Sequence, residues 1–378
     1  MSLPGLVGAT PEGPGFEPDL EPLWARSEWL QQLDGCPQDP IYHAEGDVAL
    51  HTRAVVAALC SDPAWQALPE AERLELYAAA LVHDLGKPRV TRPLEGGRYS
   101  SRGHPRVGAR VVRQLMWRAG VEFKLRERIC ALVEHHLVPF QAHDLEHPQR
   151  SLRRIGLSVE LSKLAILARA DALGRTSSLQ GELLASLELF RELAQELEVR
   201  GGVCPYPDPW SRFRYFRDPS RSPQAEAYDD SRAQVVVLSG LPGVGKSTWA
   251  ARELPDWPRI SLDELRLELG ISPTENQGPL VSAARARARE HLRAERSFVW
   301  DATNLSRDLR RQVIDLCDAY RARVRLVYLE VPPAVAERQN RERAAPVPRA
   351  AIERMLRRWD VPDPAEACEV EYRVTTAP

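Results

Sequence analysis

The chain has 378 residues, of which 43% are hydrophobic and 28% charged, and a formal net charge of −2 at pH 7. This length is enough for two domains with full cores, and the near-neutral charge excludes broad non-specific binding of nucleic acid, although a local arginine cluster can still recognise a nucleic-acid end. The six scattered cysteines include no CxxC pair, so we expect reduced thiols. No run approaches the roughly 18 apolar residues of a membrane span, and the N-terminus lacks a secretory signal. We therefore expect a cytoplasmic protein with no membrane partner.

The first half of the chain has a helical pattern. Residues 1–22 are rich in proline, glycine and acidic residues, which is typical of a flexible tail. Residues 23–200 then carry apolar residues at three- and four-residue spacing with little β-branched alternation, and the clearest examples are 53–60, 70–83, 107–117 and 161–173. We expect an all-α helical bundle over residues 23–200.

The second half changes character after a proline-rich connection. Residues 201–232 contain two adjacent glycines, five prolines and the aromatic and arginine cluster Trp210–Arg217. These side chains either stack on bases and contact phosphates or dock the connection onto a domain, and we favour docking. From residue 233 to 378, strand-like runs alternate with helices, which predicts an α/β domain with a parallel sheet; the runs are 235–238, 298–300 and 324–329.

A candidate metal cluster lies in the helical half, at His83-Asp84-Leu85-Gly86-Lys87. Adjacent residues on a helix point about 100° apart, so both can contact one ion only at a helix end or a local distortion. Further candidate ligands are spread over the same half: His51, His104, His135 or His136, and Asp171. Imidazole and carboxylate ligands suit Mn, Fe, Co, Ni, Cu or Zn rather than calcium. A lone histidine is usually a core or surface residue, but this set predicts a site for one or two divalent ions.

Such a site has a defined chemistry. A bound cation activates water and neutralises charge on an attacked phosphoryl group. Lys87 follows the doublet by one turn and is placed to hold a phosphate oxygen. His43 is either a further contact or a structural residue.

The second half carries a phosphate loop, Gly240-Leu241-Pro242-Gly243-Val244-Gly245-Lys246-Ser247, between a hydrophobic strand and a helix. The loop built on its glycines presents backbone N–H groups to the polyphosphate, Lys246 reaches the β- and γ-phosphates, and Ser247 binds Mg²⁺, with Thr248 beside it. We therefore expect ATP and Mg²⁺ as cofactors. Only four of the 51 basic residues are lysines, and two of them are Lys87 and Lys246; a compact ammonium fits between phosphate oxygens where a planar guanidinium does not.

Residues for a phosphate acceptor follow the loop. Asp263 and Arg266 are three apart on one predicted helical face, where the carboxylate can take the proton of an attacking hydroxyl and the arginine can hold an acceptor phosphate; the alternative is a solvated helix start. Asp301 ends an apolar strand, as a Mg²⁺-binding acid does. A cluster that can close over the transferring phosphate as a lid comprises Arg338, Arg341 and Arg343. We favour Arg343 within it.

Residues 36–190 resemble the HD phosphohydrolase superfamily, and the segments 43–51, 83–87 and 169–175 look like the HD module of bacterial tRNA nucleotidyltransferases. This resemblance implies first-metal ligands at His51, His83, Asp84 and Asp171. It also implies that His104 and one of His135 or His136 serve a second metal or the phosphate. Residues 233–378 resemble the 5′-OH polynucleotide kinase domain in their phosphate loop, Asp-x-x-Arg, Asp-Ala-Thr-Asn and arginine-lid segments.

In this order the two halves resemble the bacterial HD-Pnk family of nucleic-acid end-healing enzymes. The resemblance implies ATP-dependent phosphorylation of 5′-OH ends and metal-dependent removal of 2′,3′-cyclic phosphate, 2′-phosphate and 3′-phosphate ends. Ribonuclease-type cleavage produces a 2′,3′-cyclic phosphate and a 5′-OH, so the expected partners are RNA or DNA ends and a nucleic-acid ligase in the same pathway. Two alternatives are a small-molecule nucleotidase fused to a metabolite kinase, and an NTP-driven switch with a ligand-binding HD domain.

Overall fold

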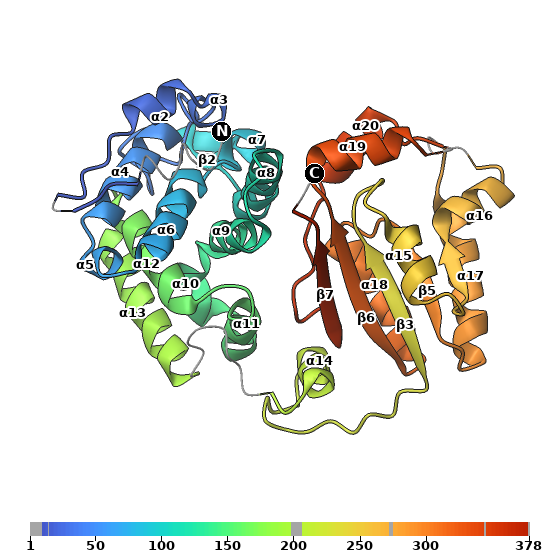
Figure 1. Ribbon diagram of the computed structural model, residues 1–378. Helices are drawn as coiled ribbons and strands as arrows, with labels where there is room; N and C mark the ends of the chain where they lie inside the picture. The colour runs from blue at the N-terminus through green and yellow to red at the C-terminus, as the bar shows by residue number, and fades with distance from the viewer. Residues whose placement is uncertain (1–9, 14, 198–205, 272–274, 344, 377–378) are drawn as a thin grey trace. The chain divides into compact units, whose positions relative to one another are not determined.

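The computed structural model describes residues 10–13, 15–197, 206–271, 275–343 and 345–376, and the chain divides into two compact units, Met1–Cys204 and Pro205–Pro378 (Figure 1). The first unit is a helical bundle and the second contains a parallel sheet, so the predicted fold class is confirmed. Among the described residues, no helix is long and apolar enough to cross a membrane.

The helices of the first unit pack around a common apolar core. They are α2 (Glu21–Ala25), α3 (Glu28–Gln31), α4 (Val48–Cys60), α5 (Pro63–Gln66), α6 (Glu70–Val82), α7 (Lys87–Val90), α8 (His104–Arg118), α9 (Phe123–His135), α10 (Val138–Gln141), α11 (Pro148–Ile155), α12 (Leu161–Leu173) and α13 (Gln180–Glu196). Helix α6 contacts α4, α9 and α12. Because its second half, Leu76 to Val82, is buried on every side, that half carries no polar stripe.

The first unit also contains elements that its helical pattern did not predict. Strands β1 (Arg92–Pro93) and β2 (Tyr99–Ser100) form an antiparallel hairpin between α7 and α8. Within the segment predicted as a flexible tail, Phe16 packs edge-on against Trp65 with ring centroids 5.7 Å apart, and Leu20 is buried. Residues 1–9 and 14 of that segment lie outside the described residues.

The second unit is a five-stranded parallel sheet in the order β4-β5-β3-β6-β7. Its strands are β3 (Ala233–Ser239), β4 (Arg259–Ser261), β5 (Phe298–Asp301), β6 (Ala322–Glu330) and β7 (Glu369–Val374). Its helices are α14 (Pro209–Arg217), α15 (Lys246–Glu253), α16 (Leu262–Glu268), α17 (Gly278–Arg293), α18 (Arg307–Ala319), α19 (Pro333–Arg341) and α20 (Arg349–Leu356). Strand β3 is central and nearly all of it is buried, as expected of a parallel sheet covered on both faces.

The strand order places the phosphate loop at a topological switch point. Within the sheet, β4 and β5 lie on one side of β3, and β6 and β7 lie on its other side. Ligands of open α/β sheets bind at the carboxyl ends of the strands where the order reverses. The loop between β3 and α15 occupies this position.

Helix α14 lies within the predicted interdomain connection and packs on the second unit. Trp210 and Phe213 join the apolar core of that unit, and the indole N–H of Trp210 donates to the carbonyl of Tyr228 at 3.0 Å. Arg214 and Arg217 both pair with Asp318 of α18. These contacts favour the docking interpretation of the aromatic and arginine cluster over base stacking.

Candidate metal centre and phosphate-binding site

Residues from five helices meet in the core of the helical unit. Helix α6 ends at Val82 and His83 is its C-cap, so the His83-Asp84 doublet lies at a helix end. His104 is the first residue of α8, and His136 is the C-cap of α9. Helices α4 and α12 contribute His51 and Asp171 from their interiors. All six side chains are at least nine-tenths buried.

Asp84 is the centre of this cluster. Its Oδ1 lies 3.2 Å from Nε2 of His104 and 4.0 Å from Nε2 of His136. Its Oδ2 lies 3.1 Å from Nε2 of His83 and 3.8 Å from Nε2 of His51. His51 Nε2 is also 3.1 Å from Oδ1 of Asp171.

Potential ligand atoms fall into two adjoining groups, each within 4.8 Å: His51, His83 and Asp171, and Asp84, His104 and His136. This division leaves room for one ion or two. His135, the alternative to His136 at the end of α9, is in neither group.

Three imidazoles are oriented by the same local contact. Nδ1 of His83, His104 and His136 each lies 2.8–2.9 Å from the backbone carbonyl three residues earlier, at Ala80, Ser101 and Val133. A carbonyl oxygen only accepts, so each Nδ1 carries a proton and each Nε2 faces the cluster, where it offers a lone pair when the ring is neutral. Metal-binding histidines are commonly held in this way.

Several atoms in the cluster lack the hydrogen bonds that burial demands. Nε2 of His51, Nε2 of His83 and both carboxylate oxygens of Asp84 are buried, and their close contacts with described residues lack the geometry of a hydrogen bond. Leaving such groups unpaired is costly. A divalent ion would satisfy them, and the nitrogen and oxygen donors suit a transition metal. The residues present therefore fit the implied metal.

The electrostatics keep the two carboxylate ligands ionised and His136 neutral, whereas the pKa of His83 is raised because the charge of Asp84 outweighs its burial. Burial alone would raise the pKa of Asp84, but the charges of His83 and Lys87 hold it well below its usual range. Asp171 likewise has a lowered pKa, because Arg175 outweighs its burial. Burial lowers the pKa of His136 to about 3, so this ring is neutral at pH 7 and its lone pair is available.

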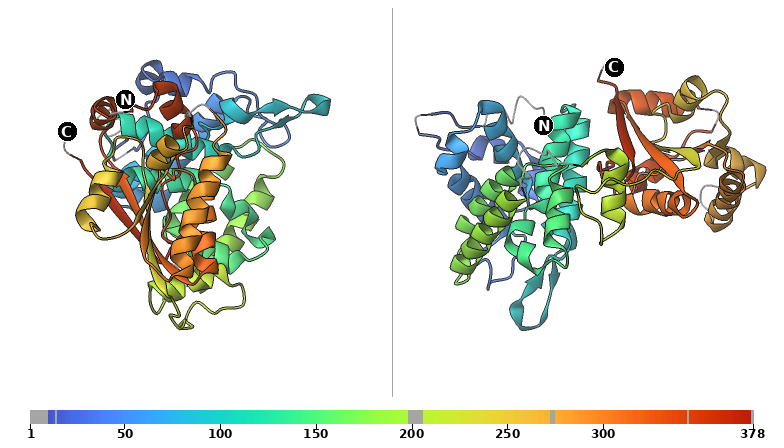
Figure 2. Two further views of the ribbon diagram at one scale, coloured as in Figure 1. Left: turned by 90° about the vertical axis from the view of Figure 1, so that its right-hand side faces the viewer. Right: turned by 90° about the horizontal axis from the view of Figure 1, so that it is seen from below.

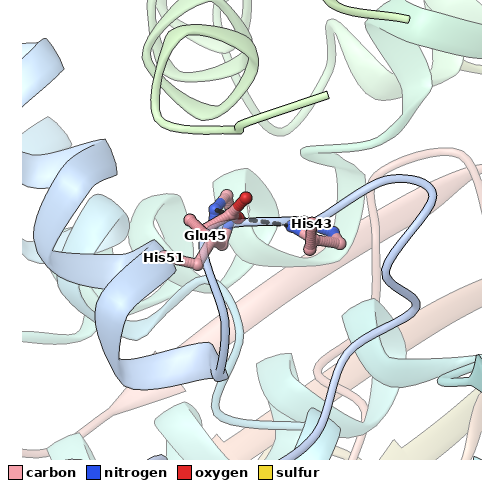
Figure 3. A group of neighbouring side chains, drawn as sticks. All are labelled: His43, Glu45 and His51. Carbon is pink, nitrogen blue, oxygen red and sulfur yellow. Dashed lines mark hydrogen bonds and ion pairs between the residues drawn. The ribbon is translucent and has the colours of Figure 1, made fainter. Parts of the chain in front are cut away.

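A supporting carboxylate, Glu45, was missed as a site residue by the sequence analysis. Its Oε1 lies 2.8 Å from Nδ1 of His43 and 2.9 Å from Nδ1 of His51 (Figure 3), and its Oε2 accepts from the amide of Thr176 at 2.8 Å. Two imidazoles already approach the same oxygen, so we interpret this group as an orienting shell for His51 rather than a separate ion site. The signal in the sequence was an acid within a few residues of two histidines.

Two cations pair with the acidic ligands. Arg175 donates to both oxygens of Asp171, at 2.9 and 2.6 Å, from one turn further along the chain. Nζ of Lys87 lies 2.7 Å from Oδ2 of Asp84 and donates to Oε1 of Gln38 at 2.6 Å. Lys87 is therefore adjacent to the position where a phosphate oxygen would meet the cluster.

In the second unit, the phosphate loop requires glycine at two positions. Gly240 has φ +151° and a Cβ there would lie 2.4 Å from the carbonyl oxygen of Leu329, at the end of β6. Gly243 has φ +79° and a Cβ there would lie 2.6 Å from the carbonyl oxygen of Ala336 in α19. The loop is therefore held between β3, β6 and the backbone of α19. Gly245 also has a positive φ, +86°, and is the N-cap of α15.

The cofactor-binding side chains lie together at the start of α15. Nζ of Lys246 donates to the carbonyl oxygens of Gly240 and Leu241, at 2.9 and 2.8 Å. Oγ of Ser247 donates to Oδ2 of Asp301 at 2.6 Å, which pairs the two side chains predicted to contact Mg²⁺. Thr248 is exposed in the same turn.

The acceptor residues and one lid arginine form a cluster. Asp263 accepts from Arg266 at 2.6 Å through Oδ1 and from Arg343 at 2.6 Å through Oδ2. Burial would raise the pKa of Asp263, but these two hydrogen bonds outweigh it and leave the pKa lowered. Arg338 and Arg341 are exposed in the last turn of α19 and make no ion pair with the described residues.

Asn304 and Arg310 support the loop and were also missed. Asn304 has φ +42°, and its amide donates to the carbonyl of Leu238 at 2.7 Å, next to the phosphate loop. Arg310 is fully buried, donates to the carbonyl of Asn304 at 3.1 Å and forms a double ion pair with Glu366 at 2.7 and 2.8 Å. No periodicity or spacing signals this contact, because Arg310 and Glu366 are 56 residues apart.

Comparisons with known proteins agree with these two sites. A family model described as HD domain matches residues 49–176, and one described as AAA domain matches residues 235–362. The A-adding tRNA nucleotidyltransferase of Deinococcus radiodurans is 37% identical over 127 residues, which is 33% of this chain and 29% of that protein. The CC-adding tRNA nucleotidyltransferase of Thermus thermophilus is 33% identical over 131 residues, which is 34% of this chain and 29% of that protein.

The chain thus spans less than a third of each of these two relatives. Among solved structures, a gluconokinase from Sinorhizobium meliloti is similar with a TM-score of 0.29 and 19% identity, over 39% of this chain and 86% of that one. The HD domain match contains His51, His83, Asp84, His104, His136 and Asp171, and the AAA domain match contains the phosphate loop, Asp263, Asp301 and Arg343. The chain therefore joins a region that matches the HD domain to a region that matches the AAA domain and contains the phosphate loop.

Proposed function

We propose that this chain is a bifunctional nucleic-acid end-healing enzyme, which phosphorylates 5′-OH ends with ATP and removes 2′,3′-cyclic, 2′- and 3′-phosphates. The observation that carries the proposal is the Asp263 cluster. An NTP-driven switch has no need of a carboxylate held between Arg266 and Arg343 near a phosphate loop, whereas transfer of a phosphoryl group to a hydroxyl does. The same chain carries a buried histidine and aspartate cluster suited to phosphate hydrolysis.

In the hydrolytic site, His51, His83, Asp84 and Asp171 would hold a divalent ion, and Asp84, His104 and His136 would hold a second ion or contact the phosphate. The ion supplies Lewis-acid activation of water and neutralises charge at phosphorus. The protein's own part is to hold each Nε2 toward the cluster and to keep both carboxylates ionised. Lys87 moves from Asp84 and Gln38 to a phosphate oxygen of the substrate.

In the kinase site, the loop from Gly240 to Ser247 receives the triphosphate of ATP, and Lys246 exchanges its two loop carbonyls for phosphate oxygens. Ser247 and Asp301 hold Mg²⁺. Asp263 orients the attacking 5′-hydroxyl and takes its proton. Arg266 holds the acceptor phosphate, and Arg343 neutralises charge on the phosphoryl group in transit.

Two considerations favour a polynucleotide over a metabolite as the substrate. The relatives that share sequence with this chain are named for action on tRNA. In addition, the two activities are chemically complementary on one broken strand, because ribonuclease-type cleavage leaves a cyclic phosphate on one side and a 5′-OH on the other. A ligase can join neither end directly, which makes a ligase the expected consumer of the products.

The proposal is tested with labelled RNA that carries a 5′-OH and a 2′,3′-cyclic phosphate, incubated with ATP, Mg²⁺ and each candidate transition metal. We expect Asp263→Asn to lose 5′ phosphorylation and keep 3′-end processing, and Asp84→Asn to do the reverse. The retained activity of each variant shows that it is folded. Glu268→Gln, on the same helix as Asp263 and 51% exposed, is the matched control and keeps both activities.

The outcomes separate the rival functions. If either variant lost both activities or neither, the assignment of two independent sites would be wrong. If free nucleosides were phosphorylated as fast as oligonucleotides, the small-molecule nucleotidase and kinase interpretation would replace the polynucleotide one. The same reaction repeated with a DNA strand bearing a 3′-phosphate decides between RNA and DNA.

A further inference from the structure

The hairpin between α7 and α8 concentrates positive charge beside the metal cluster. From residue 87 to 106 the sequence contains one acidic residue, Glu95, and six basic residues, namely Lys87, Arg89, Arg92, Arg98, Arg102 and Arg106. The whole chain has a net charge of −2, so this local excess is not a property of the composition. These residues form one continuous segment that runs from α7 through the hairpin into the first turn of α8.

The hairpin is anchored at both ends to the metal cluster. Its first end follows Lys87, whose ammonium contacts Asp84 at 2.7 Å. Its second end leads into His104, whose Nδ1 lies 2.9 Å from the carbonyl of Ser101. The base of the hairpin therefore adjoins the cluster in which a terminal phosphate would be bound.

The hairpin is held in one conformation rather than left loose. The hydroxyls of Thr91 and Ser101 are 2.8 Å apart across its base, and the amide of Leu94 donates to the carbonyl of Arg98 at 2.8 Å near its tip. Arg98 Nε also donates to Oδ2 of Asp39 at 3.0 Å, which ties the tip strand to the loop before α4. Figure 2 shows the hairpin projecting from the helical bundle.

Three arginines of the hairpin and the helix α7 that leads into it have no acidic partner among the described residues. Arg89, Arg92 and Arg102 are exposed and form no ion pair with any residue in the described part of the chain. In contrast, Arg214 and Arg217 of α14 are paired with aspartates. Charges that the fold leaves unpaired on a rigid projection are available to a ligand with several negative charges.

We propose that this hairpin, residues 89–102, binds the phosphodiester backbone of the strand whose 3′ end enters the metal cluster. This inference rests on the proposed end-healing function and names the part of the substrate that the helical unit recognises. The hairpin contacts phosphates and carries little sequence information, so it selects a polynucleotide over a mononucleotide without selecting a base. The metal cluster handles only the terminal phosphate.

The magnitude follows from counterion release. Each phosphate contact on a single strand contributes about 0.7 to the slope of log K against log salt. Three lost contacts therefore reduce that slope by about 2 and weaken binding roughly 100-fold at 0.1 M salt. A mononucleotide does not extend to the hairpin and is unaffected.

The test compares two substrates with the same reactive end: a nucleoside 2′,3′-cyclic monophosphate and a 12-nucleotide RNA ending in a 2′,3′-cyclic phosphate. The variant is Arg89→Ser, Arg92→Ser and Arg102→Ser together in the full chain. We expect kcat/KM for the RNA to fall about 100-fold and kcat/KM for the monophosphate to stay within twofold. The control of equal charge change is Arg26→Ser, Lys124→Ser and Arg191→Ser together, at exposed positions on other elements, and it keeps both values.

A direct binding assay separates failure of this inference from failure of the proposed function. Fluorescence anisotropy with a 5′-phosphorylated, 3′-phosphorylated RNA 12-mer, in the presence of a chelator and at several salt concentrations, measures binding without turnover. A smaller salt slope in the hairpin variant supports the inference even if no hydrolysis is found.

An unchanged slope and unchanged RNA kinetics would overturn the inference while leaving hydrolysis of the monophosphate intact. It would also be overturned if the variant lost affinity for vesicles with anionic lipid headgroups but not for RNA.

Discussion

Arg310 offers the sharpest test of how the phosphate loop is supported. Its side chain has no exposed surface, and it donates to both oxygens of Glu366 and to the carbonyl oxygens of Asn304 and Asp360. Arg310→Met removes the guanidinium from all of these acceptors, although the carbonyl of Asn304 still accepts from Oγ of Ser239 at 3.0 Å. We expect the second unit to be strongly destabilised and ATP binding to weaken, because Asn304 also holds β3 next to the loop.

The size of the effect can be worked out from these contacts. Removing one partner of a buried ion pair costs about 3–5 kcal/mol. The lower figure applies, because Glu366 still accepts from the amide of Asp363 at 3.0 Å and lies 3.8 Å from Nε of Arg307. The carbonyl of Asp360 loses its side-chain donor and adds about 1 kcal/mol, whereas that of Asn304 still accepts from Oγ of Ser239 at 3.0 Å. The total of about 4 kcal/mol corresponds to a fall in Tm of roughly 8–16 °C for a unit of this size.

Differential scanning calorimetry of the full chain measures this shift, and added ATP identifies the transition of the second unit by raising it. Arg311→Met is the matched control, since this neighbour is 66% exposed and lies 3.7 Å from Asp308; it should change stability by less than about 0.5 kcal/mol. Arg310→Met combined with Glu366→Leu should recover at least half of the loss. A decrease in Tm of less than about 2 °C in Arg310→Met would refute the conclusion that Arg310 supports the phosphate loop.

Three further predictions concern the two sites. Gly243→Ala should weaken ATP binding, measured by titration, at least tenfold, because the added Cβ would meet the backbone of α19. The control is Gly270→Ala, at a position with φ +63° and open space around it. It should cost only about 1 kcal/mol of stability and leave the affinity for ATP unchanged. Glu45→Gln should weaken transition-metal affinity in a competition titration by about 10–100-fold through His51, while the exposed Glu21→Gln does not; equal affinities would refute an orienting role. Burial lowers the pKa of Lys246 to about 8, and bound phosphates raise it again, so ATP affinity should fall as pH rises above about 8, by up to tenfold per unit. Calorimetry in buffers of different ionisation enthalpy should then record proton uptake on binding, and its absence at pH 8.5 would contradict this.

Elements with strong periodicity could be predicted from the sequence, and short ones could not. The predicted helices 70–83 and 161–173 correspond to α6 and α12, and the strand run 324–329 lies inside β6. Strands β1 and β2 have two residues each and β4 has three, which is too short for any hydrophobic period to appear. Two of them, β1 and β2, pair to form the hairpin that we propose binds RNA.

In the candidate site, too, some residues could be predicted from the sequence and others could not. Spacing and residue type were enough to nominate His51, His83, Asp84, His104 and Asp171, and the structure brings all five together. The sequence could not decide between His135 and His136. The two rings point about 100° apart at the end of α9, and only packing decides which one faces inward. Glu45 and Arg310 act through other residues, and their partners are defined only by the folded chain.

The four lysines show what the ammonium group is used for in a chain otherwise built with arginine. Lys87 meets oxygens of Asp84 and Gln38, and Lys246 meets two loop carbonyls. Lys163, outside both motifs, lies 3.3–3.7 Å from the carboxylates of Glu72, Glu75 and Glu160. Only Lys124 is exposed.

Three of the four lysines thus each lie close to two or three oxygen atoms, an arrangement that suits a compact ammonium with three rotatable donors. Under the proposed function, Lys87 and Lys246 are the two lysines that exchange some of these oxygens for those of a phosphate. Lys163 contacts three carboxylates that all belong to the protein, so we expect it to remain paired with them. Lys87 and Lys246 rest on acceptors that a phosphate can displace, which makes them the two lysines able to take part in chemistry.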